Sequence, residues 1–391
     1  MKKTIFVLLI LTMLAVLSAE TTFSYKGVLR TRMAMYNYIG EDTPTYSYID
    51  TRLRMSFIPS FSENLKAVWQ LEIGDIDWGE LQSGGGVNTD GINVETKHLY
   101  LDFVCPKSGF NASIGLLRFE DHNSFVLGAD MGAIMLKKSI GPGAVQIGTA
   151  KLLENDYDAD DDTDLFFLNY YHKNFGIENI VRRYNGGDYI DAWLMPYFIY
   201  TLDKVIFDIQ AMYNYGHYKM DDRIARNEDV TNGGYAVDFK VKYKSALELG
   251  LEFVYVSGDD GEDPEKTTIF NTIAEYNFNG LEIFGRNIHD GQQIGWIGTN
   301  NGTLGTMNAI LTGAYPFTDD MKIKVACGYL NTVEKVNDET NRGMEFDLGF
   351  NWDIYKPLAF DLVGAMAMPN EDYYGDSDSV FELCSRVQYK F

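Results

Sequence analysis

The 391-residue sequence contains little cysteine, proline or histidine, with 3 Cys, 9 Pro and 5 His. Cys105 falls in a predicted turn, and Cys327 and Cys384 occupy opposite phases of predicted strands, so we expect no structural disulfide. No Pro/Ser-rich linker separates domains in series. The histidines have no metal-ligand spacing, and no nucleophile elbow, P-loop or Cys-x-x-Cys motif occurs. We therefore predict no catalytic residues and no cofactor.

Beyond the N-terminus, the sequence also lacks long apolar segments, and it has no excess of positive charge. The longest later apolar runs, such as residues 192–200, are shorter than the roughly 20 residues that a transmembrane helix needs. The formal net charge is −23, from 56 acidic and 33 basic residues. This balance excludes nucleic-acid binding through the net field, because such binding requires a basic face.

The first 19 residues have the order of a secretory signal peptide. Lys2 and Lys3 precede an apolar stretch at residues 5–17, and Ser18 and Ala19 supply the small residues of a cleavage site. We predict cleavage after Ala19, which leaves residues 20–391 as one mature domain. An uncleaved anchor is the alternative interpretation.

What the sequence does contain is regular alternation of apolar and charged residues. In residues 23–35 the odd positions are mostly apolar, whereas even positions carry Lys26, Arg30 and Arg32. Because strand side chains point alternately to the two faces of a sheet, such a strand has one apolar and one charged face. The same alternation recurs in residues 49–57, 65–73, 204–215, 235–244 and 344–353.

Alternation alone also fits an antiparallel sandwich, but three further features favour a membrane barrel. The apolar faces are nearly free of charge, and a lipid-facing Lys or Arg at the midplane would cost about 2–4 kcal/mol. The opposite faces carry rows of charge, as expected for a water-filled lining. Aromatic residues, among them 26 Tyr and 24 Phe, concentrate near segment ends. Lipid leaves no partner for an open sheet edge, so the sheet must close on itself.

Short and long links alternate along the chain, as expected for periplasmic turns and acidic external loops. Our segmentation gives about 20 strands, and the doubtful hairpin at residues 176–188 would reduce the number to 18. We therefore predict an all-β, single antiparallel up-and-down barrel of about 18 strands, within a range of 16–20, with both termini in the periplasm. The predicted short turns are residues 59–64, 105–109, 140–143, 173–176, 201–204, 245–246, 279–280, 316–320 and 353–357.

The last predicted strand, residues 381–391, alternates and ends in the aromatic Phe391. This pattern resembles the C-terminal signal by which outer-membrane proteins are recognised for assembly. The alternative is a strand that ends in Phe by chance. The expected location is the outer membrane of a Gram-negative bacterium, and the expected partners are lipid, lipopolysaccharide, the assembly machinery and small hydrophilic solutes. A homotrimer is left open.

Several segments of the first third carry a resemblance to a known family. They are residues 27–33, 48–75, 97–103, 112–125 and 128–136. In this order they resemble the porin-type and alginate-export-type barrels of Gram-negative bacteria. The resemblance implies two arginine-bearing first strands, and then a strand with a Gly-Arg-type motif that leads into a loop folded into the pore. Where the family often has Gly-Arg-Gln, this chain has Gly115-Leu116-Leu117-Arg118.

If the even positions of the first strands face the lumen, basic side chains cover one wall. Arginine suits planar anionic groups such as carboxylates and phosphates, so this wall could select anionic solutes or set a transverse field. Alternatively, neighbouring carboxylates pair with the arginines and merely satisfy them. Both interpretations can hold together. The candidate pore-lining residues are Lys26, Arg30, Arg32, Asp50, Arg52, Arg54, Lys66, Glu72 and Arg118.

Residues 119–131 are the candidate constriction loop, largely by resemblance. Glu120, Asp121 and Asp130 would make this loop acidic, and we expect it to face the basic wall. An ordinary external loop is the alternative.

The densest acidic run lies at residues 154–164. Asp156, Asp158 and Asp160 are hard oxygen ligands, so calcium binding is an alternative, but the central Gly and distal Glu of a calcium loop are absent. A solvated external loop fits the run better.

Together these observations predict an outer-membrane porin for passive diffusion of small hydrophilic solutes, and not an enzyme. The main alternative is a substrate-selective channel for anionic saccharides, as the alginate-export resemblance suggests. A plugged structural barrel and a barrel hydrolase, with a Ser/His pair hidden across strands, are the remaining alternatives.

Overall fold

The computed structural model describes residues 21–40, 46–87, 93–154, 162–185, 189–219, 229–263, 265–274, 280–285, 288 and 302–391. The predicted signal peptide, residues 1–19, lies outside this set. In the described part of the chain, no helix is long and apolar enough to cross a membrane.

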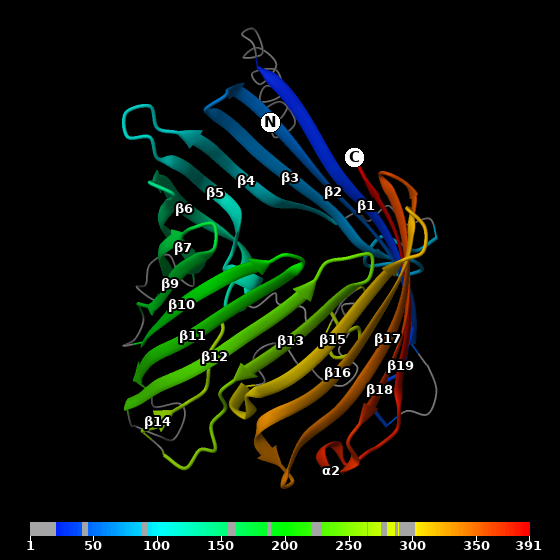
Figure 1. Cartoon of the computed structure of the whole chain (residues 1–391). Coiled ribbons are helices and arrows are strands. Elements are labelled where there is room, and N and C mark those ends of the chain that lie inside the picture. The colour runs from blue at the N-terminus through cyan, green and yellow to red at the C-terminus, as the bar shows by residue number, and fades with distance from the viewer. Residues whose placement is uncertain are drawn as a thin grey trace.

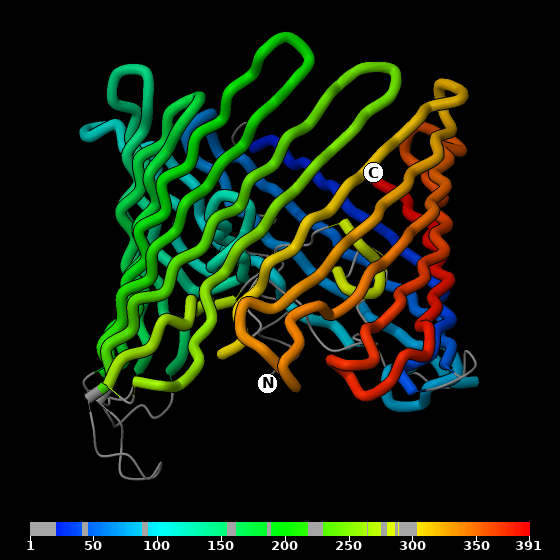
Figure 2. The backbone as a smooth tube through the Cα atoms, turned by 60° about the horizontal axis from the view of Figure 1, so that its bottom comes forward, coloured from blue at the N-terminus to red at the C-terminus, as the bar shows by residue number. Residues whose placement is uncertain are grey.

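One antiparallel sheet closes on itself (Figures 1 and 2). β1 (Thr22–Tyr36) pairs with β2 on one side and with β19 (Val380–Lys390) on the other. The two-residue β14 (Lys266–Thr267) pairs parallel to β12 at its end and is not part of the wall, which leaves 18 wall strands. The predicted single up-and-down barrel of about 18 strands is therefore confirmed. The other wall strands are β2 (Tyr46–Ser62), β3 (Leu65–Asp77), β4 (Val94–Val104), β5 (Asn111–Glu120), β6 (Gly128–Ile140), β7 (Gly143–Leu153), β8 (Thr163–Tyr171), β9 (Phe175–Tyr184), β10 (Tyr189–Leu202), β11 (Val205–Lys219), β12 (Asp229–Tyr243), β13 (Glu248–Val256), β15 (Thr306–Pro316), β16 (Met321–Val336), β17 (Glu339–Tyr355) and β18 (Leu358–Pro369).

The alternation of β1 separates the two faces of the wall. Leu29 and Met33 are each 41% exposed on the outer, apolar face, whereas Arg30 and Arg32 are 8% and 4% exposed on the inner face. The inner side chains are covered by their neighbours and by chain segments inside the barrel. The period-2 pattern thus placed the two faces correctly.

The C-terminal residue completes the barrel seam. The Phe391 N–H donates to the Gly27 carbonyl at 3.0 Å, and the Gly27 N–H donates to the Phe391 carbonyl at 2.8 Å. The last strand of the sequence is therefore the strand that joins the two ends of the sheet.

The predicted turn at residues 279–280 is wrong as a wall hairpin. β13 pairs directly with β15, and the described residues 268–274 and 280–285 contribute no strand to the wall. The doubtful hairpin at residues 176–188 is correct, because β9 is a full wall strand and β10 begins at Tyr189 and pairs with it. The two extra strands of our segmentation belong instead to the 257–305 loop between β13 and β15. Described residues of this loop, such as Phe270 and Leu281, are buried inside the barrel, and part of the loop is drawn in yellow inside the ring of strands in Figure 2.

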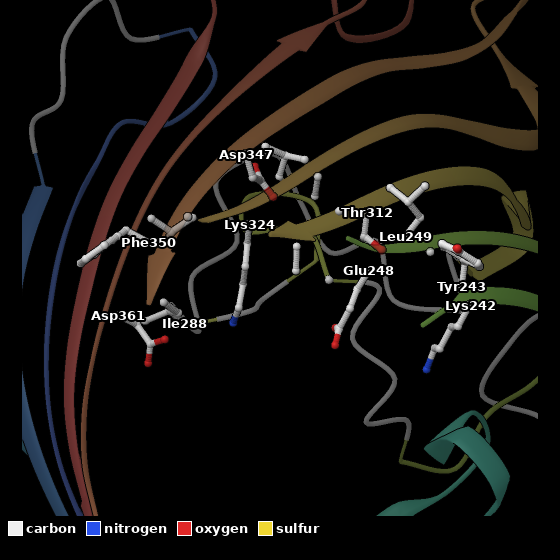
Figure 3. Close-up of a pocket in the computed structure, with 18 of the residues that line it drawn as sticks. Lys242, Tyr243, Glu248, Leu249, Ile288, Thr312, Lys324, Asp347, Phe350 and Asp361 are labelled. Carbon is white, nitrogen blue, oxygen red and sulfur yellow. The ribbon is translucent and has the colours of Figure 1, made fainter. Parts of the chain in front are cut away.

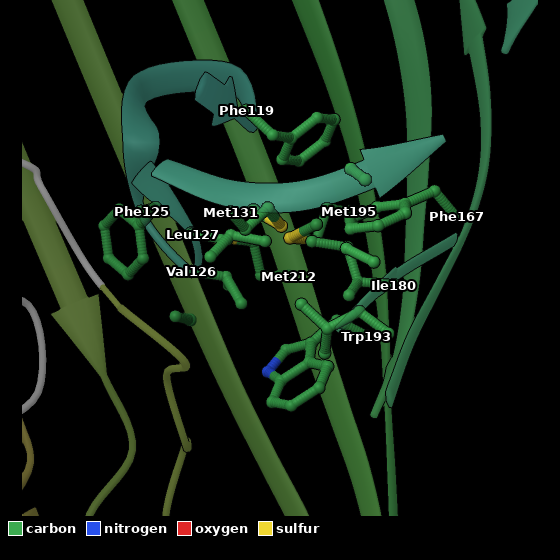
Figure 4. Close-up of a cluster of buried hydrophobic side chains, with 14 of the residues drawn as sticks. Phe119, Phe125, Val126, Leu127, Met131, Phe167, Ile180, Trp193, Met195 and Met212 are labelled. Atoms are coloured by element: carbon green, nitrogen blue, oxygen red, sulfur yellow. The ribbon is translucent and has the colours of Figure 1, made fainter. Parts of the chain in front are cut away.

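A second segment also fills the lumen. The tip of the β5–β6 hairpin, residues 117–131, includes the short 3-10 turn η2 (His122–Ser124) and crosses the inside of the barrel (Figure 4). Phe125, Val126 and Leu127 at this tip are fully buried against Trp193 and Met195 of β10. This region of the inner wall is therefore apolar, which a uniformly wet lining does not predict.

Candidate pore lining and constriction

The basic wall of β1–β3 is an ion-pair network. Arg32 donates from Nε to Oδ2 of Asp50 at 3.0 Å, and Arg30 donates from Nη2 to Oδ1 of Asp75 at 2.6 Å. Nη1 of Arg52 lies 3.5 Å from Oδ2 of Asp75. Asp75, at the end of β3, thus bridges two strands and was missing from the sequence-based set.

The remaining wall cations differ in their pairing. Arg54 contacts the carboxylate of Glu72, and Nζ of Lys66 lies 3.1 Å from Oδ2 of Asp102. Lys26 is exposed and forms no ion pair within 4 Å with any described residue. The alternative in which carboxylates satisfy the arginines therefore describes this wall well, and a role in selectivity remains a proposal.

A β-bulge on β4 adds two residues that the alternation hid. Gln70 faces His98 and Leu71 faces Thr96, so Lys97 is the extra residue of the bulge. As a result neighbouring side chains reach the same carboxylate: Asp130 accepts from Lys97 at 2.8 Å and lies 2.9 Å from Nε2 of His98. Strict alternation would place Lys97 and His98 on opposite faces of the strand.

Asp130 also connects the bulge to the inward hairpin. Nη1 of Arg118 lies 3.6 Å from Oδ1 of Asp130, and Nε of Arg118 donates to Oε1 of Glu120 at 2.5 Å. The candidate constriction residues Glu120 and Asp130 are thus both paired with Arg118.

The hairpin tip is held against strands β9–β12. The ring of His122 stacks on Tyr197 with centroids 3.9 Å apart, and its Nε2 lies 2.7 Å from Oδ1 of Asp208. The His122 backbone N–H donates to Glu178 at 2.7 Å. Asn123 donates to Asp238 at 3.2 Å. Four side chains from four successive strands therefore fix one turn of the hairpin.

Asp121 organises this turn and does not face the basic wall as we expected. It is 4% exposed, and its carboxylate accepts the N–H groups of Phe125 and Val126 at 2.8 Å each and of Leu127 at 2.5 Å. Burial and the neighbouring Glu178 carboxylate raise the pKa of Asp121 to about 8, although the three N–H donors oppose this shift. The structure therefore assigns the Asp121 carboxyl group to the interior of its own loop.

The inner part of the 257–305 loop is held in a similar way, but by β17. Glu345 accepts the backbone N–H groups of Ile283 and Phe284 at 2.7 Å each, and Asp347 accepts that of Glu282 at 3.1 Å. The sequence could have indicated Glu345 and Asp347 as acceptors for this loop only if the loop had first been recognised as lying inside the barrel.

The two inward segments meet each other and the basic wall. The Gly128 N–H donates to the Ala274 carbonyl at 2.7 Å, and the Ile273 N–H donates to the Val126 carbonyl at 2.9 Å. Nη1 of Arg32 donates to the Ile288 carbonyl at 2.9 Å. The lumen therefore contains one connected inner structure that joins three regions of the wall.

The acidic run at residues 154–164 is described only at its ends. Lys151 lies 3.4 Å from Glu154 and 3.2 Å from Asp164, and it also contacts Asp162. The candidate calcium ligands Asp156, Asp158 and Asp160 lie outside the described residues.

Among the comparisons with known proteins, the one with solved structures identifies the fold. No family model and no curated protein sequence matches the chain. Among solved structures, it is similar to OccK9 (OpdG) of Pseudomonas aeruginosa, with a TM-score of 0.62 and 11% identity over 94% of this chain and 98% of that one. It is similar to OpdK of Pseudomonas aeruginosa, solved with vanillate, with a TM-score of 0.59 and 10% identity over 94% and 98% of the two chains. Acinetobacter baumannii OccAB3 gives a TM-score of 0.59 and 10% identity over 94% and 99%. The chain therefore has the fold of these barrels along nearly its whole length, as the resemblance to porin-type barrels predicted.

Proposed function

We propose that this protein forms a water-filled channel for passive diffusion of small hydrophilic solutes across the outer membrane of a Gram-negative bacterium. The observation that carries the proposal is the closed wall itself, with exposed apolar residues such as Leu29 outside and ionised residues such as Arg30 inside. Apolar outer faces suit lipid, and a charged lining suits water.

The inward segments support a narrow rather than a wide pore. The 117–131 hairpin and the described part of the 257–305 loop are attached to the wall and to each other, so they reduce the open cross-section of the lumen. We assign the constriction to these two segments, with Arg118, Glu120 and Asp130 as its polar edge. The basic wall would influence ion selectivity, together with Lys26, which has no ion pair among the residues that the structure describes.

Export and assembly are part of the proposal. We propose that the signal peptide is removed after Ala19 and that the outer-membrane assembly machinery recognises the C-terminal strand. Intact mass of the purified protein tests the removal of the signal peptide, because a mature chain starting at Glu20 is expected.

Deletion of Phe391 tests the recognition of the C-terminal strand, and an unchanged yield of folded barrel would remove that role. Contacts with lipid and lipopolysaccharide follow from the location. A homotrimer is a further proposal, and a monomer mass in native mass spectrometry would overturn it.

Liposome swelling with sugars of increasing size separates the function classes. A channel gives uptake that decreases with solute size, whereas a plugged structural barrel gives none. A barrel hydrolase would instead release product from lipid or ester substrates. Absence of sugar uptake by correctly folded protein would contradict the channel.

A further inference from the structure

A recess of about 420 Å³ lies at the wall formed by β12, β13 and β15–β18, and Gly280 and Ile288 of the segment between β13 and β15 also line it (Figure 3). Three small residues, Gly250, Ala314 and Gly349, are part of its lining. Ile288 lies beside Asp361 at one side of the recess (Figure 3). Thr312 adds a hydroxyl group to this lining. The recess has the size of a small-solute site.

Several charged side chains of this recess differ from the arginines of the basic wall, because they are exposed and have no ion-pair partner among the described residues. Lys242, Lys244, Glu248 and Lys324 form no ion pair within 4 Å among the described residues. The carboxylates at the margins are already engaged: Asp361 accepts from Arg386 at 2.9 Å, and Asp347 accepts the Glu282 N–H at 3.1 Å. The charges available to a solute are therefore Lys242, Lys244, Glu248 and Lys324.

The strand register places the negative charge between the two positive ones. Glu248 pairs with Ala314, which pairs with Lys324, so Glu248 and Lys324 are two strands apart, about 10 Å between Cα atoms. Lys242 pairs with Gly250, which makes it a diagonal neighbour of Glu248, at about 7–8 Å. Lys244, also at the recess, adds positive charge on the Lys242 side.

We infer that this recess binds aminodicarboxylates, solutes in which an ammonium group lies between two carboxylates. Each lysine would bind one carboxylate, and Glu248 would bind the ammonium group. A dicarboxylate without the ammonium group would be repelled by Glu248, and a monocarboxylate would leave one lysine unpaired. The inference rests on the proposed channel function, because a solute reaches the recess only through the lumen.

The test is current block in planar bilayers at low salt, where ion pairs are least screened. The solutes are glutamate, glutarate, which lacks the ammonium group, and glutamine, which lacks the second carboxylate. Glutamate should block at a concentration about two- to fivefold lower than either analogue, as exposed ion pairs provide. Glu248→Gln should remove the preference over glutarate, and Lys242→Gln or Lys324→Gln should remove the preference over glutamine.

The matched control is Lys137→Gln on β6, away from the recess strands (Figure 1). Nζ of Lys137 lies 4.7 Å from the ring centroid of Tyr171, outside the recess. This variant should keep both preferences. Equal block by glutamate and glutarate in the unaltered protein, or a preference that survives Glu248→Gln, would overturn the inference.

Failure of the channel itself is recognised separately. If folded protein carries no current, the proposed function is wrong, and the three solutes are then titrated against the detergent-solubilised barrel by calorimetry. Tighter binding of glutamate there would support the recess, and equal affinities would overturn it.

Discussion

The imidazole of His122 lies parallel to the phenol ring of Tyr197, with an interplanar angle of 4° and 3.9 Å between ring centroids. Since His122 is at the tip of the 117–131 hairpin and Tyr197 is on β10, this contact holds the tip of the hairpin against the barrel wall. Nε2 of His122 also lies 2.7 Å from Oδ1 of Asp208 on β11. His122 thus contributes two of the contacts that hold the proposed constriction in position.

His122→Ala should loosen the hairpin tip. The variant loses the stacking contact and the bond to Asp208, which together stabilise the tip by about 1–3 kcal/mol. We expect larger current fluctuations and a higher mean conductance in single-channel recordings. His172→Ala, in the turn between β8 and β9, is the control and should leave both unchanged. Recordings of His122→Ala that match the unaltered protein would show that the tip does not depend on this contact.

Asp121→Ala should have a larger effect than His122→Ala. Three buried N–H groups lose their acceptor, and each such loss costs about 1–3 kcal/mol. Limited proteolysis of the reconstituted barrel should then cleave within residues 121–127, whereas the unaltered protein resists. Equal resistance of the two proteins would argue against the assigned role of Asp121.

The raised pKa of Asp121, about 8, also predicts a pH dependence. The folded state holds this proton more tightly than the unfolded state does, so the stabilising contribution is full below the unfolded pKa, near 4, and is lost as pH rises through 8. Stability in urea should therefore fall from pH 6 to pH 8 by roughly 1 kcal/mol per pH unit. Asp121→Asn should flatten this dependence. An equally steep decline in Asp121→Asn would assign the dependence to another group.

Arg32 and Asp50 should show strong energetic coupling. Both are buried, at 4% and 1% exposed, so removal of either partner leaves a buried charge and should cost about 3–5 kcal/mol of unfolding free energy. The double variant Arg32→Met/Asp50→Leu should recover most of this loss. Urea denaturation in detergent measures the cycle. Additive losses in the double variant would contradict a buried pair.

Glu345→Ala should release the inner part of the long loop from β17. Glu345 is fully buried and accepts the N–H groups of Glu282, Ile283 and Phe284. We expect a higher single-channel conductance, because the loop no longer narrows the lumen. Glu95→Ala, an exposed carboxylate on β4, serves as the control. A conductance equal to that of the control would place the constriction elsewhere.

Neutralising Arg52 and Arg54 tests the basic wall. Their partners Asp75 and Glu72 remain, so the lumen gains net negative charge and should favour cations. In Arg52→Gln/Arg54→Gln we expect the ratio of potassium to chloride permeability to rise by about twofold. Reversal potentials in a salt gradient measure this ratio. Unchanged potentials would remove both arginines from ion selection.

The barrel wall could be predicted from the sequence because side-chain orientation in a strand has period two. In β1, apolar residues such as Leu29 alternate with polar residues such as Arg30, because one face of the strand is directed to lipid and the other to the lumen. The inward position of the basic residues on β1 followed directly from this alternation. Their partners were less accessible, because Asp75 lies beyond the regular part of β3.

The interior could not be predicted by the same rule. Phe270, Leu281 and Ile283, on either side of Asn279-Gly280 in the sequence, have the composition of a wall hairpin, but they are buried in apolar clusters inside the barrel instead of facing lipid. The bulge at Lys97 likewise shifts the phase of β4 without any local signal. Polarity patterns identify a sheet face reliably only where that face is covered by lipid alone or by water alone, and not where other segments of the chain pack on it.

Single-channel conductance of the refolded protein in planar bilayers tests the central claim most directly. We predict discrete, reproducible current steps that persist at low voltage, and these steps should grow when the inward hairpin is loosened. Folded barrels that insert into the bilayer but pass no current, or a folded chain that stays monomeric in water without detergent, would contradict the account.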